Sequence, residues 1–389
     1  GDHETQPGSM IGSHGFLAPA APPNEVTLVS VPNPAPAPAW IANCDAAQAY
    51  AQQALNHTTV ALDTEFIRTQ TYHAELGLVQ LATPESIALV DPLVAGVGLT
   101  LVPLLGAPGV LKIVHSASED LEVLGHALGQ IPEPLFDTQI AAVLCGYELP
   151  PSYQKLVQAE LGIALDKHAT RTDWLKRPLD AEQLRYAAED VEHLHPLYAR
   201  LSRQLAELGR SDWLAEDCAR AVAKAHAPVD PLPHLKMRSI ERLSPVQQQR
   251  LWRLLVWRDH EAMQRNRPKR WILDNPVAIR AAVLDNPTRA QLEAAVAADG
   301  KPSTRLAQKL EALLQEPASD KELAIPLQTQ QSEAERQRAK TLRDQVNNVA
   351  ERLGISPETL LPRRASDHWA RYDSLPDDLL GWRVQVLGL

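Results

Sequence analysis

The stretch "VALDTEFIRT", residues 60–69, places an aspartate and a glutamate two positions apart at the end of an apolar run. The apolar start predicts a buried strand, and side chains two apart along a strand point to the same face. Asp63 and Glu65 would therefore lie side by side and repel each other unless a cation lies between them. The stretch thus predicts a strand that ends in paired carboxylates, whose partners must come from elsewhere in the chain.

Short apolar runs in and after this stretch predict a sheet. They are separated by turn residues, as strands are, and comprise residues 60–62, 78–81, 87–90 and 113–114. Helical patterns follow at "SEDLEVLGHAL" and "TQIAAVLCGY", and one long helix is expected over "DAEQLRYAAEDVEHLHPLYARLSRQLAEL". Strands and helices together predict an α/β domain over residues 26–209.

The chain from about Gly209 onward lacks convincing strand patterns and is predicted to be helical. The expected helix starts carry capping residues: Ser244 with Pro245 and Gln247, Asn275 with Pro276, Asn286 with Pro287, and Ser332 with Glu335. The segment "AHAPVDPLPHL" is the expected linker, and "LQEPASDKELAIPLQ" is expected to divide the helical part in two. We therefore predict a disordered arm over residues 1–25, the α/β domain over 26–209, and helical domains over 235–316 and 327–389.

Composition indicates a globular protein of the cytoplasm. The 389 residues are 44% hydrophobic and 22% charged, and the three cysteines show no zinc-ligand spacing, which is typical of a reducing compartment. The uncharged residues 92–111 contain several glycines and prolines, so they predict a loop with one short helix rather than a membrane span. No signal-peptide pattern is present, and no association with a membrane is expected.

Charge is unevenly distributed along the chain, whose formal net charge is −10. Residues 235–272, called here the basic segment, hold ten basic and three acidic residues, with Trp252, Trp257 and Trp271 interleaved. Such a segment can bind phosphates and stack bases, but a basic helix face is also often solvated surface. Both interpretations remain open from the sequence.

Further acidic residues follow the paired carboxylates. In "KIVHSASEDLEVL" Asp120 lies in the first turn of a helix after a strand, where it could serve only to complement the helix dipole. In "RYAAEDVEHLHPLY" Tyr186 and Asp190 share a helix face because they are four residues apart, and a hydrogen-bonded structural pair is the ordinary interpretation. Asp137 in "FDTQIA" is interpreted as a helix cap.

The ordered combination resembles a known family. Asp-x-Glu on a strand, Asp after a later strand, and Tyr-x-x-x-Asp on a helix resemble the tyrosine branch of the DEDD superfamily of 3′-to-5′ exonucleases. Within it, "ALDTEFIRTQTY", "LGLVQLA", "HSASEDLEVL", "DTQIAAVLCG" and "LDKHATRTDWLKRPL" resemble the bacterial ribonuclease D family. The second half, with "GISPETLLPRR" and "LLGWR", resembles helicase-and-RNase-D C-terminal (HRDC) domains.

The resemblance implies an α/β exonuclease domain, RNase H-like with a mixed sheet and flanking helices, followed by one or two all-α HRDC-type domains. It also implies two divalent metal ions, and oxygen-only ligands favour Mg²⁺ or Mn²⁺. By analogy, Asp63 would bridge both ions, Glu65 and Asp190 would complete the site of the water-activating ion, and Asp120 would hold the second. Tyr186 would hydrogen-bond the attacking water.

Three further residues are candidates for contact with the substrate. Lys167 and Arg177 are expected along the phosphate track with Trp174 packed beneath it; the alternative is a surface loop pinned by Asp173 and Trp174. His115 in "VHSASED" is the third candidate, and its alternative is a buried histidine with satisfied hydrogen bonds.

The expected function is that of a monomeric, metal-dependent 3′-to-5′ exoribonuclease. It would trim RNA 3′ ends, precursor tRNA among them, and release nucleoside 5′-monophosphates. A proofreading DNA exonuclease and a catalytically inactive RNA-binding protein are the alternatives. No nucleotide cofactor is expected. The segment "ADGKPST", residues 298–304, superficially resembles a phosphate-binding loop, but the glycine required five positions before Gly300 is Ala295, and Pro302 follows Lys301.

Overall fold

The computed structural model describes residues 37–166, 172–227, 229–298 and 302–389. The arm expected over residues 1–25 and the candidate Lys167 lie outside these described residues. No helix among the described residues has the length and apolar character that a membrane crossing requires.

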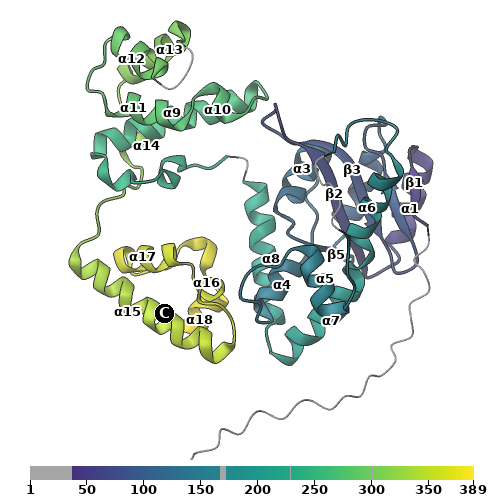
Figure 1. Ribbon diagram of the computed structural model, residues 1–389. Coiled ribbons are helices and arrows are strands. Elements are labelled where there is room, and N and C mark those ends of the chain that lie inside the picture. Colours follow the sequence, from purple (N-terminus) through teal and green to yellow (C-terminus); the bar gives the residue numbers. More distant parts are fainter. Residues whose placement is uncertain (1–36, 167–171, 228, 299–301) are drawn as a thin grey trace, which may run out of the picture. The chain divides into compact units, whose positions relative to one another are not determined.

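A six-stranded mixed sheet in the order β1-β4-β3-β2-β5-β6 forms the first part of the chain, as predicted (Figure 1). Its strands are β1 (Ala39–Ile41), β2 (Thr59–Ile67), β3 (Glu75–Ala82), β4 (Ile87–Val90), β5 (Leu111–Val114) and β6 (Leu135–Asp137). Strand β3 runs antiparallel to its neighbours β2 and β4, and the other pairs are parallel. Strands β1 and β6 were not predicted, because three residues are too few to show an alternating pattern.

Helices flank this sheet. They are α1 (Cys44–Ala54), α2 (Val102–Leu105), α3 (Ser118–Leu128), α4 (Thr138–Leu144), α5 (Tyr153–Leu161), α6 (Ala181–Glu192), α7 (Leu194–Glu207) and α8 (Ser211–His226). Before β5 begins at Leu111, the uncharged residues from 92 onward contain only the 3₁₀ turn η1 (Gly98–Leu101) and the short α2, as expected. Helix α6 packs against β2, β3 and β4, and so covers one face of the sheet (Figure 1).

The single long helix expected over residues 180–208 is wrong, because the chain breaks at His193 between α6 and α7. Pro196 lies in the first turn of α7, where it has no N–H to donate and its ring would clash with the carbonyl of residue 192 in a continuous helix. The hydroxyl of Tyr153 accepts a hydrogen bond from the His193 N–H at 3.2 Å and stabilises the break.

All described elements after α8 are helical. They are η2 (Pro233–Lys236), η3 (Ile240–Arg242), α9 (Pro245–Gln264), α10 (Lys269–Ile272), α11 (Asn275–Val283), α12 (Arg289–Ala297), α13 (Thr304–Gln315), α14 (Asp320–Leu323), α15 (Glu333–Leu353), α16 (Pro357–Leu360), α17 (Arg363–Tyr372), η4 (Asp377–Leu379) and α18 (Trp382–Leu387). The predicted caps Ser244 and Ser332 both form capping boxes. The other two caps are Asp274 and Thr288, not Asn275 and Asn286, because their side chains accept the first free N–H groups.

Two hydrophobic cores hold these helices. We call α9–α13 the first helical module; its core is separate and includes Leu251, Leu292 and Leu310. We call α15–α18 the second helical module; its buried side chains, such as Trp382, belong to the same core as the sheet. Trp382 stacks on Trp213 of α8 with ring centroids 4.3 Å apart.

Candidate active site

Three carboxylates from two distant elements meet on the α6 face of the sheet. One ligand atom from each of Asp63, Glu65 and Asp190 lies within 4.8 Å of the other two. Alternation along β2 places Asp63 and Glu65 on one face, and α6 brings Asp190 to it. The paired carboxylates of the opening stretch therefore gain a third carboxylate rather than a basic side chain, and this is a donor set for a hard divalent cation.

Helix α6 begins at a fixed point in the chain. Asp180 accepts a hydrogen bond from the Gln183 N–H at 2.8 Å, and the Gln183 side chain accepts from the Asp180 N–H at 3.0 Å. Two turns later, the hydroxyl of Tyr186 donates to the carboxylate of Asp190. The predicted i, i+4 pair on α6 thus lies in the site, and its tyrosine is hydrogen-bonded to Asp190, a candidate metal ligand.

Asp120 lies beside this group but is not a member of it. It is buried in the first turn of α3, and its carboxylate accepts a hydrogen bond from the hydroxyl of Thr64. Thr64 is the residue between the paired carboxylates on β2. The hydrogen bond therefore ties the first turn of α3 to the strand that carries Asp63 and Glu65.

Burial is the largest cause that raises the pKa of each of the four carboxylates. Burial, followed by the charge of Asp120, raises the pKa of Asp63 well above its usual range. Burial and the charge of Asp190 raise the pKa of Glu65 to about 9. Burial also raises the pKa of Asp120 and of Asp190 to about 7, against the lowering effect of Thr64 and Tyr186, respectively. At neutral pH the cluster can be fully ionised only when cations neutralise it.

The turn before α3 is held by Asp137, which the sequence suggested only as a helix cap. Its side chain does cap α4, accepting from the Gln139 N–H at 2.8 Å. It also accepts from the N–H groups of Ser116, at 3.0 Å, and Ala117, at 2.9 Å. Asp137 therefore positions the turn that leads to Asp120, a role that needs the unpredicted strand β6.

The break after α6 is held by Tyr153, whose importance the sequence did not reveal. Its hydroxyl donates to the carbonyl of Glu189 at 2.9 Å and accepts from the N–H of His193. These two backbone groups flank Asp190, so the buried Tyr153 fixes the end of α6 that carries the third carboxylate.

His115 has no ring nitrogen left for a substrate. Its Nδ1 lies 2.9 Å from the hydroxyl of Thr138, and its Nε2 lies 3.2 Å from the carbonyl oxygen of Pro151. Burial lowers the pKa of His115. These contacts fit the alternative interpretation of a buried, hydrogen-bonded histidine.

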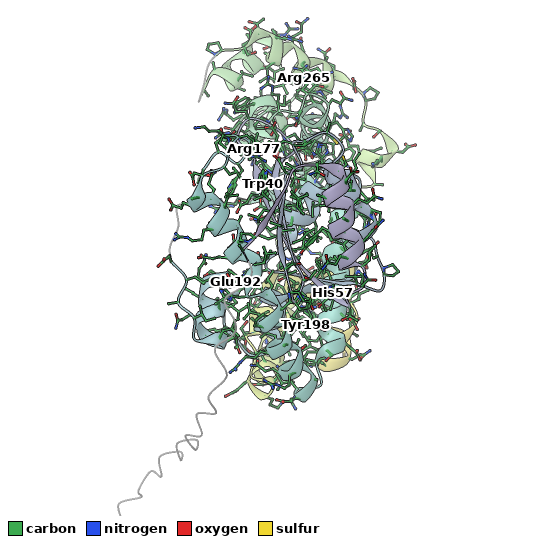
Figure 2. The ribbon with its side chains drawn as sticks, turned by 90° about the vertical axis from the view of Figure 1, so that its right-hand side faces the viewer. Trp40, His57, Arg177, Glu192, Tyr198 and Arg265 are labelled. Atoms are coloured by element: carbon green, nitrogen blue, oxygen red, sulfur yellow. The ribbon has the colours of Figure 1, made fainter. Side chains whose placement is uncertain are left out.

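Arg177 does not line a phosphate track, contrary to the expectation. Its Nε and one Nη bond the carboxylate of Asp91 at 2.8 and 2.6 Å, and its other donors bond backbone carbonyls, including Gly77 at 2.6 Å and Trp174 at 2.8 Å. All five N–H groups are thereby used within the protein. Figure 2 shows Arg177 next to Trp40, whose ring centroid lies 5.5 Å from the guanidinium carbon.

Trp174 is buried beneath this arginine, and its main chain lies so close to Gly77 that a Cβ there would be 2.7 Å from the Trp174 carbonyl oxygen. The loop is therefore pinned to β3, which agrees with the alternative interpretation. A cavity of about 510 Å³ lies at this edge of the sheet. Its lining residues are Trp40, Asp91, Arg177, Pro178, Leu179 and Leu184.

The basic segment is largely neutralised by its own ion pairs. Six of its ten cations are paired: Lys236 with Asp230, Arg250 with Asp285, Arg253 with Glu322, Arg258 and Lys269 with Asp259, and Arg265 with Glu261. The four that form no ion pair among the described residues are Arg238, Arg242, Arg267 and Arg270. Arg267 and Arg270 flank the half-exposed Trp271, and the guanidinium carbon of Arg267 lies 6.0 Å from its ring centroid.

Comparisons with known proteins agree with this geometry. A family model described as 3′-5′ exonuclease matches residues 38–206. The chain is 41% identical over 336 residues to Ribonuclease D of Xanthomonas oryzae pv. oryzae, which covers 86% of this chain and 92% of that protein. It is 31% identical over 369 residues to Ribonuclease D of Escherichia coli, covering 88% and 92% of the two chains.

A solved structure is similar as well. The crystal structure of Escherichia coli RNase D, described as an exoribonuclease involved in structured RNA processing, matches with a TM-score of 0.79 and 29% identity. The match covers 90% of this chain and 96% of that one, so the likeness extends through the helical modules.

Proposed function

Since this chain belongs to the ribonuclease D family and is a 3′-to-5′ exoribonuclease, we propose that it trims structured RNAs, precursor tRNA among them, and releases nucleoside 5′-monophosphates. The relative of known structure supports this proposal, since it is described as processing structured RNA. We further propose that the chain acts as a monomer in the cytoplasm and that the two helical modules are HRDC-type domains.

The residues present fit divalent metal ions, and we propose two, Mg²⁺ or Mn²⁺. Asp63 would bind both, Glu65 and Asp190 would complete one site, and Asp120 would serve the other. This proposal is supported by three carboxylates whose ligand atoms lie within 4.8 Å of one another. No cationic side chain of the described residues offsets their charges. Two such ions lower the cost of forming a hydroxide nucleophile and stabilise charge on the phosphate and the leaving oxygen.

Tyr186 would orient the attacking water. Burial and the neighbouring Asp190 raise its pKa, so the phenol keeps its proton and acts as a hydrogen-bond partner rather than as a base. Water attacks the last phosphorus atom in line, the bond to the 3′ oxygen of the preceding nucleotide breaks, and that oxygen takes up a proton. The released nucleotide keeps the phosphate on its 5′ oxygen.

Contact with RNA away from the site would use the corner between α9 and α10. Arg267, Arg270 and Trp271 are exposed there and combine charge with an aromatic surface for a base. We leave the six cations of the basic segment that are paired with acids out of this proposed contact.

One observation carries the proposed function: β2 and α6, more than 100 residues apart, bring Asp63, Glu65 and Asp190 within 4.8 Å. The test uses 5′-labelled single-stranded RNA and DNA of matched sequence, with Mg²⁺, Mn²⁺ or EDTA. Stepwise shortening of RNA that EDTA abolishes is expected. Robust cleavage in excess EDTA contradicts the metal mechanism, preference for DNA supports the proofreading alternative, and no cleavage of either supports an inactive binding protein.

A further inference from the structure

Gln80 on β3 is buried without hydrogen-bond partners. Its side chain is 0% exposed, and neither its amide nitrogen nor its amide oxygen has a partner among the described residues. Buried amides are nearly always bonded, because a lost bond to water is otherwise not replaced. The chain keeps a polar group here at a cost to its stability, in a strand whose neighbouring positions are apolar.

The position of Gln80 in the sheet points to the metal site. In the antiparallel pair of β2 and β3, Gln80 is directly opposite Asp63. Side chains of directly opposite residues lie on the same face with their Cβ atoms about 4.5–5.5 Å apart. This is the face covered by α6, because the Asp190 carboxylate from α6 reaches Asp63 there.

Gln80 has an apolar partner in the next strand, and the helix that covers its face buries apolar residues. On its other side, Gln80 is opposite the buried Leu89 of β4. Helix α6 packs over β2, β3 and β4 with Ala187, Ala188 and Val191 buried. The polar side chain directly opposite Gln80 in the strand pair is that of Asp63.

We propose that Gln80 is a positioning residue of the metal site, whose amide N–H holds the Asp63 carboxylate, directly or through one water, when metal is bound. Its role resembles that of other outer-shell groups, which orient a ligand without touching the metal. A carboxylate that binds two ions still has oxygen lone pairs free to accept a hydrogen bond. An amide N–H that donates to it fixes the orientation of the carboxylate. This inference rests on the proposed function, since it needs a metal at Asp63.

The test compares wild type with Gln80→Met, which keeps the side-chain length and removes both polar atoms. In EDTA, the melting temperature of Gln80→Met is expected to rise, because two unsatisfied buried groups are gone. Its affinity for Mg²⁺, measured by titration calorimetry without RNA, is expected to fall about 10- to 100-fold. With saturating Mg²⁺, kcat should fall and KM for a short RNA should change little.

A matched control is Gln248→Met in the first helical module. Gln248 is equally buried, but its amide donates to the carbonyls of Leu243 and Gln328 and accepts from the Gln328 N–H at 2.9 Å. This variant should melt at a lower temperature and keep wild-type metal affinity and kcat. The two glutamines are thus expected to respond in opposite ways.

Several outcomes contradict the proposal. Unchanged Mg²⁺ affinity and kcat in Gln80→Met would make Gln80 an unsatisfied amide with no role at the site. Loss of folding in both Gln80→Met and Gln80→Leu would assign it to the stability of the core instead. Failure of the wild type to bind Mg²⁺ would contradict the proposed function itself, so the two failures are distinguishable.

Discussion

The carboxylate cluster on β2 and α6 and the basic segment are both dense in charge, but the protein treats them in opposite ways. The carboxylates are brought together with no basic side chain of the described residues between them, and their pKa values rise. Six of ten cations in the basic segment are paired with acids of the same protein. Charge that the fold leaves uncompensated is available for ligands, whereas charge that it pairs stabilises the fold.

Arg177 and Gln80 extend this contrast beyond the two clusters. The sequence suggested Arg177 as a phosphate ligand, but its N–H groups all donate to Asp91 and to backbone carbonyls. The sequence did not indicate a role for Gln80, but its buried amide lies opposite Asp63 without a hydrogen-bond partner in the described part of the chain. Availability for a ligand depends on partners that are distant in sequence, and residue type alone does not reveal it.

The largest effect is expected from Asp190→Asn, which removes an uncompensated charge. It should weaken Mg²⁺ binding and lower kcat by several orders of magnitude, because the metal that stabilises the transition state loses a ligand. The matched control is Asp217→Asn, since Asp217 is paired with Arg383 at 2.7 Å. The control should melt at a lower temperature with kcat close to wild type. Similar kcat losses in both variants would contradict the distinction between unpaired charge that serves ligands and paired charge that stabilises the fold.

Tyr186→Phe removes one hydroxyl from the same site and leaves its charge unchanged. Metal and RNA should bind normally while kcat falls by roughly 10² to 10⁴, because the hydrogen bond to the attacking water acts in the transition state. Steady-state kinetics and Mg²⁺ titration of the variant measure both quantities. Turnover near the wild-type rate would limit Tyr186 to a structural bond with Asp190.

Alternation and helical periodicity predicted which side chains of the site share a face, and the resemblance to the exonuclease family assigned them to one site. Asp63 and Glu65 follow from the period of a strand, and Tyr186 with Asp190 follows from i, i+4 spacing on a helix. A sheet was likewise expected from short apolar runs and its mixed character from the resemblance, whereas its three-residue outer strands were too short to be recognised.

What the sequence could not provide is pairing across long separations. The bond from Thr64 to Asp120, which leaves Asp120 outside the group of three, spans 56 residues. The bonds from Asp137 to the turn before α3 depend on the register of β5 and β6. The break at His193 is different, because Pro196 is a local signal that the helical pattern outweighed.

The uncompensated cluster should also make metal-free stability depend on pH. Its folded-state pKa values, about 9 for Glu65 and about 7 for Asp120 and Asp190, lie above those of the unfolded chain. The folded state then binds more protons than the unfolded state. The protonated carboxyl groups therefore contribute their full share to the free energy of unfolding below about pH 4, and this contribution is lost as pH rises toward 9.

Bound metal removes this loss, because it needs the ionised carboxylates. The difference in melting temperature between Mg²⁺ and EDTA should therefore grow from pH 6 to pH 9, and Glu65→Gln should reduce the growth. If the difference in melting temperature stays constant with pH, ionisation of the metal-free carboxylates does not destabilise the fold.

The smallest effect is expected where the basic segment keeps free charge. Arg270→Ala removes an exposed cation with no ion pair among the described residues, so the Kd for structured RNA should rise only a few-fold. The slope of log Kd against log salt should fall by about 0.7–0.9, the loss of one phosphate contact. Filter binding at several salt concentrations measures both changes.

The control for Arg270 is Arg253→Met, which removes a cation of the same segment that the fold has paired. Arg253 contacts the buried Glu322 at 2.7 Å and donates to the carbonyls of Leu313 and Glu316. Leaving Glu322 unpaired should cost about 3–5 kcal/mol of the free energy of unfolding, because the charge stays buried. Below its melting transition this variant should keep the salt slope of the wild type. If Arg253→Met lowers the slope and Arg270→Ala does not, then ion pairing within the segment does not decide which of its cations contact RNA.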